Sequence, residues 1–174
     1  ILVTGGCGFI GSHFIRHMVK KYPEYDITNY DKLTYAGDLE NVSDIEGWYH
    51  NYHFVKGDIC DYDKLKKTVK ALDIDVIVNF AAESHVDNSI ENSDEFIKTN
   101  INGTHNLLKL MHEFTIHKFV QISTDEVYGS LNEHDLAFTE NSPLKPNSPY
   151  AASKTAADLL CRSFYETYKY PITI

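Results

Sequence analysis

The sequence predicts an α/β protein with a doubly wound parallel sheet, and three patterns support this fold class. Short apolar runs, too short to be helices, recur along the chain and indicate buried parallel strands. Segments with helical spacing of apolar residues separate these runs. The alternation of strand and helix holds throughout, so neighbouring strands should be parallel and joined by right-handed crossovers.

The expected elements follow one another in a simple order. Strands are predicted at 1–4, 25–30, 52–56, 76–80, 118–122 and 171–174. Helices are predicted at 9–21, 38–45, 61–72, 94–114 and 149–168, with Asp61 as the cap of its helix. The run at 76–80 is the most strand-like of all, so we expect it at the centre of the sheet.

Size and charge restrict the possible partners. The chain has 174 residues, enough for one domain with a substantial core, and 43% of them are apolar. The net charge of −9 argues against nucleic acid or an anionic membrane as a partner. No apolar run approaches the length of a membrane span, and no signal peptide precedes the first strand.

Disulfide and metal chemistry are not expected. Cys7, Cys60 and Cys161 are odd in number and widely separated, which favours reduced thiols and a cytoplasmic location. His13 and His17 lie four residues apart on a predicted helix, a spacing that can hold zinc. Since no third ligand accompanies them, we interpret this pair as part of a solvated helix face.

A glycine-rich turn follows the first strand and carries the first functional signal. Gly5, Gly8 and Gly11 are evenly spaced, and Gly6 completes a G-x-G-x-x-G pattern before a helix begins at Phe9. Such a turn lets the backbone approach a pyrophosphate, which the N–H groups of the helix N-terminus then attract. A tight strand-to-helix turn without any ligand is the alternative interpretation.

An acidic residue ends the second strand where a dinucleotide site requires one. Asp31 lies 20 residues after Gly11, the position from which a carboxylate accepts hydrogen bonds from the ribose hydroxyls of NAD. A carboxylate there repels a 2′-phosphate, so NAD is favoured over NADP, although the neighbouring Lys32 acts in the opposite direction. An aspartate in an ordinary turn is the alternative.

A possible catalytic group lies in the last third of the chain. Tyr150 and Lys154 share one face at the start of a predicted helix, and an ammonium beside a phenol lowers the phenol pKa. Asp125 and Glu126 follow the fifth strand, where an acid and a base can support elimination of water. Thr124 beside them can orient a substrate oxygen. The alternatives are an ordinary helix start and a solvated acidic turn.

These motifs resemble those of the extended short-chain dehydrogenase/reductases. The resemblance rests on the glycine loop and on Tyr150-x-x-x-Lys154, and it covers essentially the whole chain. Three further runs narrow it to the dTDP-glucose 4,6-dehydratases, namely Asp31-Lys32-Leu33-Thr34-Tyr35-Ala36-Gly37, Ala81-Ala82-Glu83-Ser84-His85-Val86-Asp87 and Ser123-Thr124-Asp125-Glu126-Val127-Tyr128-Gly129. Residues 1–174 are then expected to be the NAD-binding Rossmann domain of a longer enzyme, without its C-terminal substrate lobe.

The resemblance also implies roles for individual residues. Asp125 would donate a proton, Glu126 would accept one, and Tyr150 would be the base for oxidation of the sugar, with Lys154 and Thr124 completing the catalytic set. Ser84, His85 and Thr124 would contact a nucleotide-activated hexose, dTDP-glucose. The expected NAD site consists of Gly5, Gly8, Phe9, Ile10, Gly11, Asp31, Lys32, Thr34, Asp58, Ile59, Ala81, Ala82, Ser84, Thr99, Tyr150 and Lys154.

The implied reaction converts the hexose to a 4-keto-6-deoxy sugar, in a cytoplasmic homodimer. Two departures from the family pattern stand out: Cys7 replaces the usual alanine and would expose a thiol near phosphate, and Asn88 replaces the usual arginine. The alternatives include a nucleotide-sugar epimerase or decarboxylase. Such an enzyme needs no acidic pair, so the presence of Asp125 and Glu126 favours a dehydratase. A non-catalytic NAD-sensing module could dispense with Tyr150 and Lys154.

Overall fold

The computed structural model describes all residues from 1 to 174 and shows one six-stranded parallel sheet. The strands run in the order β3-β2-β1-β4-β5-β6, so the direction of winding reverses between β1 and β4. This arrangement confirms the doubly wound fold. The strands are β1 (Leu2–Thr4), β2 (Ile27–Asp31), β3 (Tyr52–Lys56), β4 (Val76–Asn79), β5 (Lys118–Gln121) and β6 (Ile172–Thr173).

Helical elements connect the strands. The α-helices are α1 (Phe9–Lys21), α2 (Tyr62–Ala71), α3 (Val86–Glu91), α4 (Asp94–Phe96), α5 (Thr104–Glu113) and α6 (Pro149–Tyr168). Two short 3₁₀ helices, η1 (Leu39–Val42) and η3 (Asp125–Tyr128), and one π-helical segment, η2 (Ile97–Gly103), complete the set. None of the helices is both long and apolar enough to cross a membrane.

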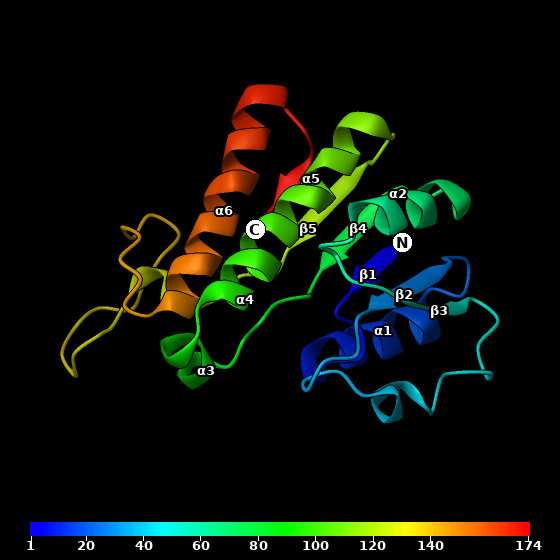
Figure 1. Ribbon diagram of the computed structural model, residues 1–174, viewed down its shortest axis with the longest axis horizontal. Helices are drawn as coiled ribbons and strands as arrows, with labels where there is room; N and C mark the ends of the chain where they lie inside the picture. The colour runs from blue at the N-terminus through cyan, green and yellow to red at the C-terminus, as the bar shows by residue number, and fades with distance from the viewer.

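Two hydrophobic cores lie on opposite faces of the sheet. Alternate residues of a strand point to opposite faces, so Leu2 joins one core and Val3 the other. The larger core packs α2, α5 and α6 against the sheet, and the smaller one packs α1 and the η1 segment. Figure 1 shows α5 and α6 side by side, with the segment between β5 and α6 projecting at the left.

Capping residues determine where two of the helices begin. The Asp61 carboxylate accepts a hydrogen bond from the Lys64 N–H at 3.1 Å, as the sequence predicts. The Ser148 hydroxyl accepts one from the Ala151 N–H at 3.0 Å, and Pro149 occupies the first turn of α6. α6 therefore starts abruptly, and Tyr150 lies in its first turn.

The helical predictions were wrong in several details. The single helix expected at 94–114 is interrupted by the π-helical η2, because Asn100 turns its side chain into the interior and bonds to neighbouring segments. The helix expected at 38–45 is only the 3₁₀ helix η1. α3 and η3 were not predicted, because both are too short and too polar to show a helical period.

Candidate cofactor and catalytic site

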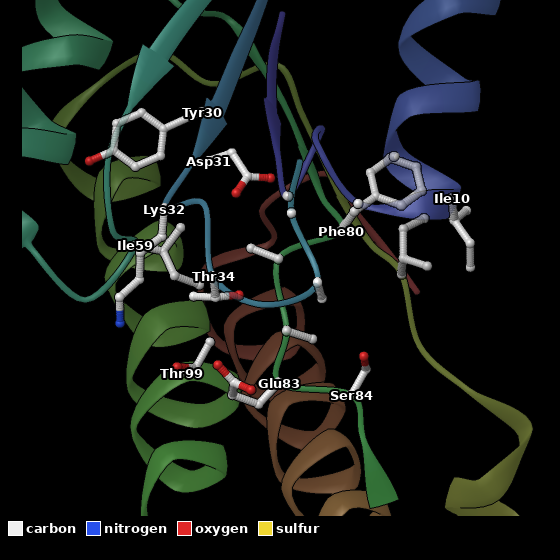
Figure 2. Close-up of a pocket in the computed structure, with 18 of the residues that line it drawn as sticks. Ile10, Tyr30, Asp31, Lys32, Thr34, Ile59, Phe80, Glu83, Ser84 and Thr99 are labelled. Atoms are coloured by element: carbon white, nitrogen blue, oxygen red, sulfur yellow. The ribbon is translucent and has the colours of Figure 1, made fainter. Parts of the chain in front are cut away.

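A cavity of about 350 Å³ opens at the carboxyl ends of the strands, beside the point where the winding reverses. Every residue expected to hold NAD lines this one cavity. Figure 2 shows Asp31, Lys32 and Thr34 on one side of it, with Ser84 and Thr99 on another. Sequence reasoning missed other lining residues, all close in sequence to predicted ones: Tyr30, Ala36, Gly37, Gly57, Phe80, Glu83, Ile122 and Ser123.

The glycine loop is close-packed and leaves no room for larger residues at two positions. Gly5 has a φ of +69°, and a Cβ there would lie 2.6 Å from the Ala81 nitrogen. A Cβ at Gly11 would lie 2.3 Å from the Gly5 carbonyl oxygen. These contacts bring α1 directly against the turn, so that the start of the helix lines the cavity.

The start of α1 is suited to an anion. Gly8 caps the helix without a side-chain hydrogen bond, and the first turn holds no acidic residue. N–H groups in a first helical turn have no partner within the helix, and the helix dipole adds a partial positive charge there. Because Gly8, Phe9, Ile10 and Gly11 all line the cavity, this end of α1 can hold a pyrophosphate.

Asp31 is buried at the end of β2 and organises the loops around it. Its carboxylate accepts hydrogen bonds from the Cys7 N–H at 2.9 Å and from the Leu33 N–H at 2.8 Å. A carboxylate has about four acceptor positions, so positions remain for two hydroxyl groups in the cavity. Asp31 therefore supports the glycine loop as well as facing the cavity.

Lys32 is paired with Asp58 rather than with its neighbour in sequence. The Lys32 ammonium and the Asp58 carboxylate lie 2.9 Å apart, joining the ends of β2 and β3. Burial disfavours the charged form of Asp58, but hydrogen bonds from the Cys60 N–H and Lys32 outweigh it and lower the pKa. The hydrogen bond to Asp58 raises the pKa of Lys32. This pairing offsets the positive charge that Lys32 brings near the ribose position.

Tyr150 lies among the predicted catalytic residues, but its pKa moves against expectation. Burial raises the pKa of Tyr150, a hydrogen bond from the Thr124 hydroxyl opposes this, and the Glu126 and Asp125 charges add to the rise. The predicted lowering of this pKa by Lys154 is absent. The Lys154 ammonium instead donates to the carbonyl of Ile122.

The acidic pair stands beside Tyr150 and not inside the cavity. Glu126 is half-buried and Asp125 is exposed, both within η3, and neither lines the cavity. The Thr124 hydroxyl caps η3 by accepting from the Glu126 N–H at 3.3 Å. Thr124 and the exposed His85 also lie outside the residues that line the cavity, whereas Ser84 is part of it.

One positioning residue could not be seen in the sequence. Asn100 in η2 is buried, accepts from the Glu83 N–H at 2.8 Å and donates to the Glu83 carbonyl at 2.9 Å. It also donates to the Ser153 hydroxyl on α6 at 2.8 Å. Its side chain thereby fixes the loop after β4 relative to α6. Only the unusual polarity of the run Thr99-Asn100 within an apolar helix could have drawn attention to it.

The two departures from the family pattern have different surroundings. Cys7 is fully buried, and its sulfur accepts a hydrogen bond from the Asn29 amide at 3.3 Å, so the expectation of an exposed thiol is wrong. Burial raises the pKa of Cys7 to about 11. Asn88 is exposed on α3. His13 and His17 are exposed on α1, and the chain contains no group of side chains arranged to hold a metal ion.

Comparison with known proteins identifies the family of the chain. The family model described as GDP-mannose 4,6 dehydratase matches residues 2–174. The chain belongs to this dehydratase family. Over its 174 residues it is 45% identical to the dTDP-D-glucose 4,6-dehydratase of Homo sapiens, covering 100% of this chain and 49% of that protein. The resemblance expected from the motifs is confirmed.

Two solved structures resemble this dehydratase-family chain closely. A dTDP-glucose 4,6-dehydratase from Bacillus anthracis in complex with NAD has a TM-score of 0.88 at 48% identity, over 98% of this chain and 52% of that one. The Streptomyces venezuelae dTDP-glucose 4,6-dehydratase with NAD and TYD bound has a TM-score of 0.91 at 44% identity, over 98% and 53%. The chain spans about half the length of the curated relatives it matches.

Proposed function

We propose that the chain binds NAD in the cavity and that the full-length protein dehydrates a nucleotide-activated hexose, dTDP-glucose, to its 4-keto-6-deoxy product. The observation that carries the proposal is the gathering of Thr124, Asp125 and Glu126 around Tyr150, next to a cavity lined by the dinucleotide residues. The relatives named dTDP-glucose 4,6-dehydratase support the same choice.

The residues of the cavity fit NAD. The first turn of α1 offers free N–H groups for the pyrophosphate, and Asp31 retains acceptor positions for ribose hydroxyls. Asp58 and Ile59 would contact the adenine, one as an acceptor and one as an apolar wall. When bound, NAD supplies a hydride acceptor that is restored at the end of the cycle. Asp31 would exclude a 2′-phosphate and so favour NAD over NADP.

Three side chains carry out the proton transfers of the proposed reaction. Tyr150, oriented by Thr124, removes the proton of the sugar 4-hydroxyl, with the Lys154 ammonium nearby at the end of β5. A ketone at carbon 4 acidifies carbon 5, and Glu126 accepts that proton. Asp125, which is exposed, protonates the departing 6-hydroxyl, and water can reach it to restore its proton. Ser84 and His85 would contact the sugar.

A single-turnover experiment with full-length protein tests these roles. Wild type and Glu126→Gln are mixed with dTDP-glucose in deuterated water, and NADH absorbance and deuterium uptake at carbon 5 are followed. We expect NADH to form in the variant while deuterium uptake falls about 10²–10⁴-fold, the usual loss for a missing general base. Tyr150→Phe should form no NADH.

The same experiment distinguishes the alternatives. Deuterium uptake at the wild-type rate in Glu126→Gln would show that Glu126 is not the base. Wild-type formation of an epimer in place of a keto-sugar would identify a 4-epimerase. NAD binding without any NADH formation would indicate a sensing module. The expected homodimer stays a prediction, which sedimentation of the full-length protein would test.

A further inference from the structure

A buried polar cluster lies beside the cavity and consists of Lys154 and Asp158 on α6, the Ser123 hydroxyl and the Ile122 carbonyl. The proposed reaction assigns no role to Asp158. Lys154 and Asp158 are one helical turn apart on the same face of α6. They are 4% and 7% exposed. Charged side chains are rarely buried this deeply unless they are paired. Asp158 needs an explanation, since no step of the proposed reaction requires it.

The cluster joins α6 to the end of β5 through two adjacent residues. The Lys154 ammonium donates to the Ile122 carbonyl, and the Ser123 hydroxyl donates to one carboxylate oxygen of Asp158. Both Ile122 and Ser123 line the cavity. The second carboxylate oxygen of Asp158 is buried without any partner. Asp158 is therefore held by Ser123 and retains unused acceptor capacity.

Lys154 and Asp158 form no direct ion pair, but each charge opposes the effect of burial on the pKa of the other group. Burial lowers the pKa of Lys154, and the charge of Asp158 opposes that change. Burial raises the pKa of Asp158, while Ser123 and Lys154 oppose it. Of the other titratable groups, Cys161 acts on Lys154, while the pKa values of Cys161 and Tyr150 are themselves raised by the charge of Asp158. The elements packed against α6 are α3, α4, α5, η2, β6 and η3, the last with Asp125 and Glu126, and none of them adds a charge that acts on Lys154.

We propose that Asp158 is a positioning residue, which fixes the Lys154 ammonium at the end of β5 and supplies the negative charge that keeps it protonated beside the cavity. The proposal deepens the proposed function, because the importance of Lys154 rests on that function. Ser123 holds one carboxylate oxygen of Asp158, and the other oxygen is buried without a partner, one helical turn from Lys154. Loss of the Asp158 charge would leave a buried ammonium with only a neutral carbonyl as its partner.

The first test measures thermal unfolding and needs no enzymatic activity. Full-length wild type, Asp158→Asn, Lys154→Met and the double variant are compared between pH 5 and 8. Asp158→Asn should lower the Tm in the wild-type background, because it leaves Lys154 unpaired. The same change should raise the Tm of Lys154→Met, because it removes an unpaired buried carboxylate.

The pH dependence of that test has a definite sign. In Lys154→Met the folded-state pKa of Asp158 is raised above its unfolded value, so stability falls as pH increases, and Asp158→Asn should remove this slope. If the single variant Asp158→Asn does not fold but the double variant with Lys154→Met does, this result also supports the proposal. A change in Tm of the same size and sign in both backgrounds would overturn the proposal.

The second test follows the pH profile of the first chemical step. NADH formation in a single turnover should decline at high pH, where Lys154 loses its proton. Asp158→Asn should move this decline to a pH about one unit lower. Above that pH, NADH formation in the variant should be up to tenfold slower than in the wild type. Glu166→Gln, which removes an exposed carboxylate from the same helix, is the matched control and should leave the profile in place.

The two tests fail separately. If the protein forms no NADH from dTDP-glucose, the proposed function fails, while the unfolding cycle still decides whether Asp158 acts through Lys154. If wild type reacts but Asp158→Asn and Glu166→Gln both retain its profile, the positioning role is refuted and the proposed function stands.

Discussion

Replacing Asp31 by alanine removes an acceptor that the glycine loop uses with or without a cofactor. The Cys7 N–H and the Leu33 N–H both lose their hydrogen-bond acceptor. A buried N–H left without a partner costs about 1–3 kcal/mol. The Cys7 bond is buried and should carry that full cost, whereas the Leu33 bond is only partly buried and water can replace it. We therefore expect Asp31→Ala to destabilise the protein by about 2 kcal/mol.

Asp31→Asn is the matched variant, since it has nearly the same shape. One side-chain oxygen remains as an acceptor, but the amide nitrogen then faces a backbone donor, so one of the two bonds is lost. Urea unfolding in the absence of NAD measures this part of the effect. Titration with NAD and NADP measures the other part, because loss of the carboxylate should narrow the preference for NAD.

Two results would refute this reasoning. Unfolding of Asp31→Ala at the wild-type urea midpoint would show that its hydrogen bonds to the loops contribute nothing. Equal affinity of the wild-type protein for NAD and NADP would show that the carboxylate does not select the cofactor. The two results are independent, so they separate the structural role from the ligand role.

Three further predictions concern other parts of the site. Gly5→Ala should prevent folding or lower the Tm sharply by circular dichroism, because the left-handed φ costs about 1–2 kcal/mol and the added Cβ would lie 2.6 Å from the Ala81 nitrogen. The lowered pKa of Asp58 contributes stability that is lost as pH falls through the folded-state value, so the Tm difference between wild type and Asp58→Asn should shrink from pH 5 to 3. Glu126→Gln removes a charge that raises the pKa of Tyr150, so the pH above which NADH forms should move lower in single-turnover profiles.

The fold and the outline of the cavity were predictable because both follow from local signals. Short apolar runs identify buried strands, and a parallel sheet brings all their carboxyl ends to one edge. Residues at or just after the strand ends, such as Asp31, Asp58 and Ala81, must therefore meet, whatever their exact contacts. The glycine loop then fixes which strand end faces the helix N-terminus.

The irregular helical parts were not predictable, because distant contacts determine them. Nothing near Asn100 in the sequence shows that its amide binds the loop after β4 and a serine of α6. The π-helical turn places that amide in the interior, where its bonds satisfy polar groups that would otherwise be buried alone. Apolar spacing over 94–114 indicates a helix but cannot show such an interruption.

The electrostatics of the site depend on burial, which residue spacing does not reveal. The four-residue spacing of Tyr150 and Lys154 places both on one face of α6. The Lys154 ammonium nevertheless donates to the Ile122 carbonyl, just after β5. The pKa of Tyr150 is raised mainly by burial and also by nearby carboxylates. A second four-residue step leads from Lys154 to Asp158, where the opposing charge lies. The Tyr-x-x-x-Lys pattern thus continues in space as Tyr, Lys and Asp along one helix face. The charge of Asp158 raises the pKa of Lys154 against the effect of burial, and so a sequence motif of two residues omits a charge that acts on one of them.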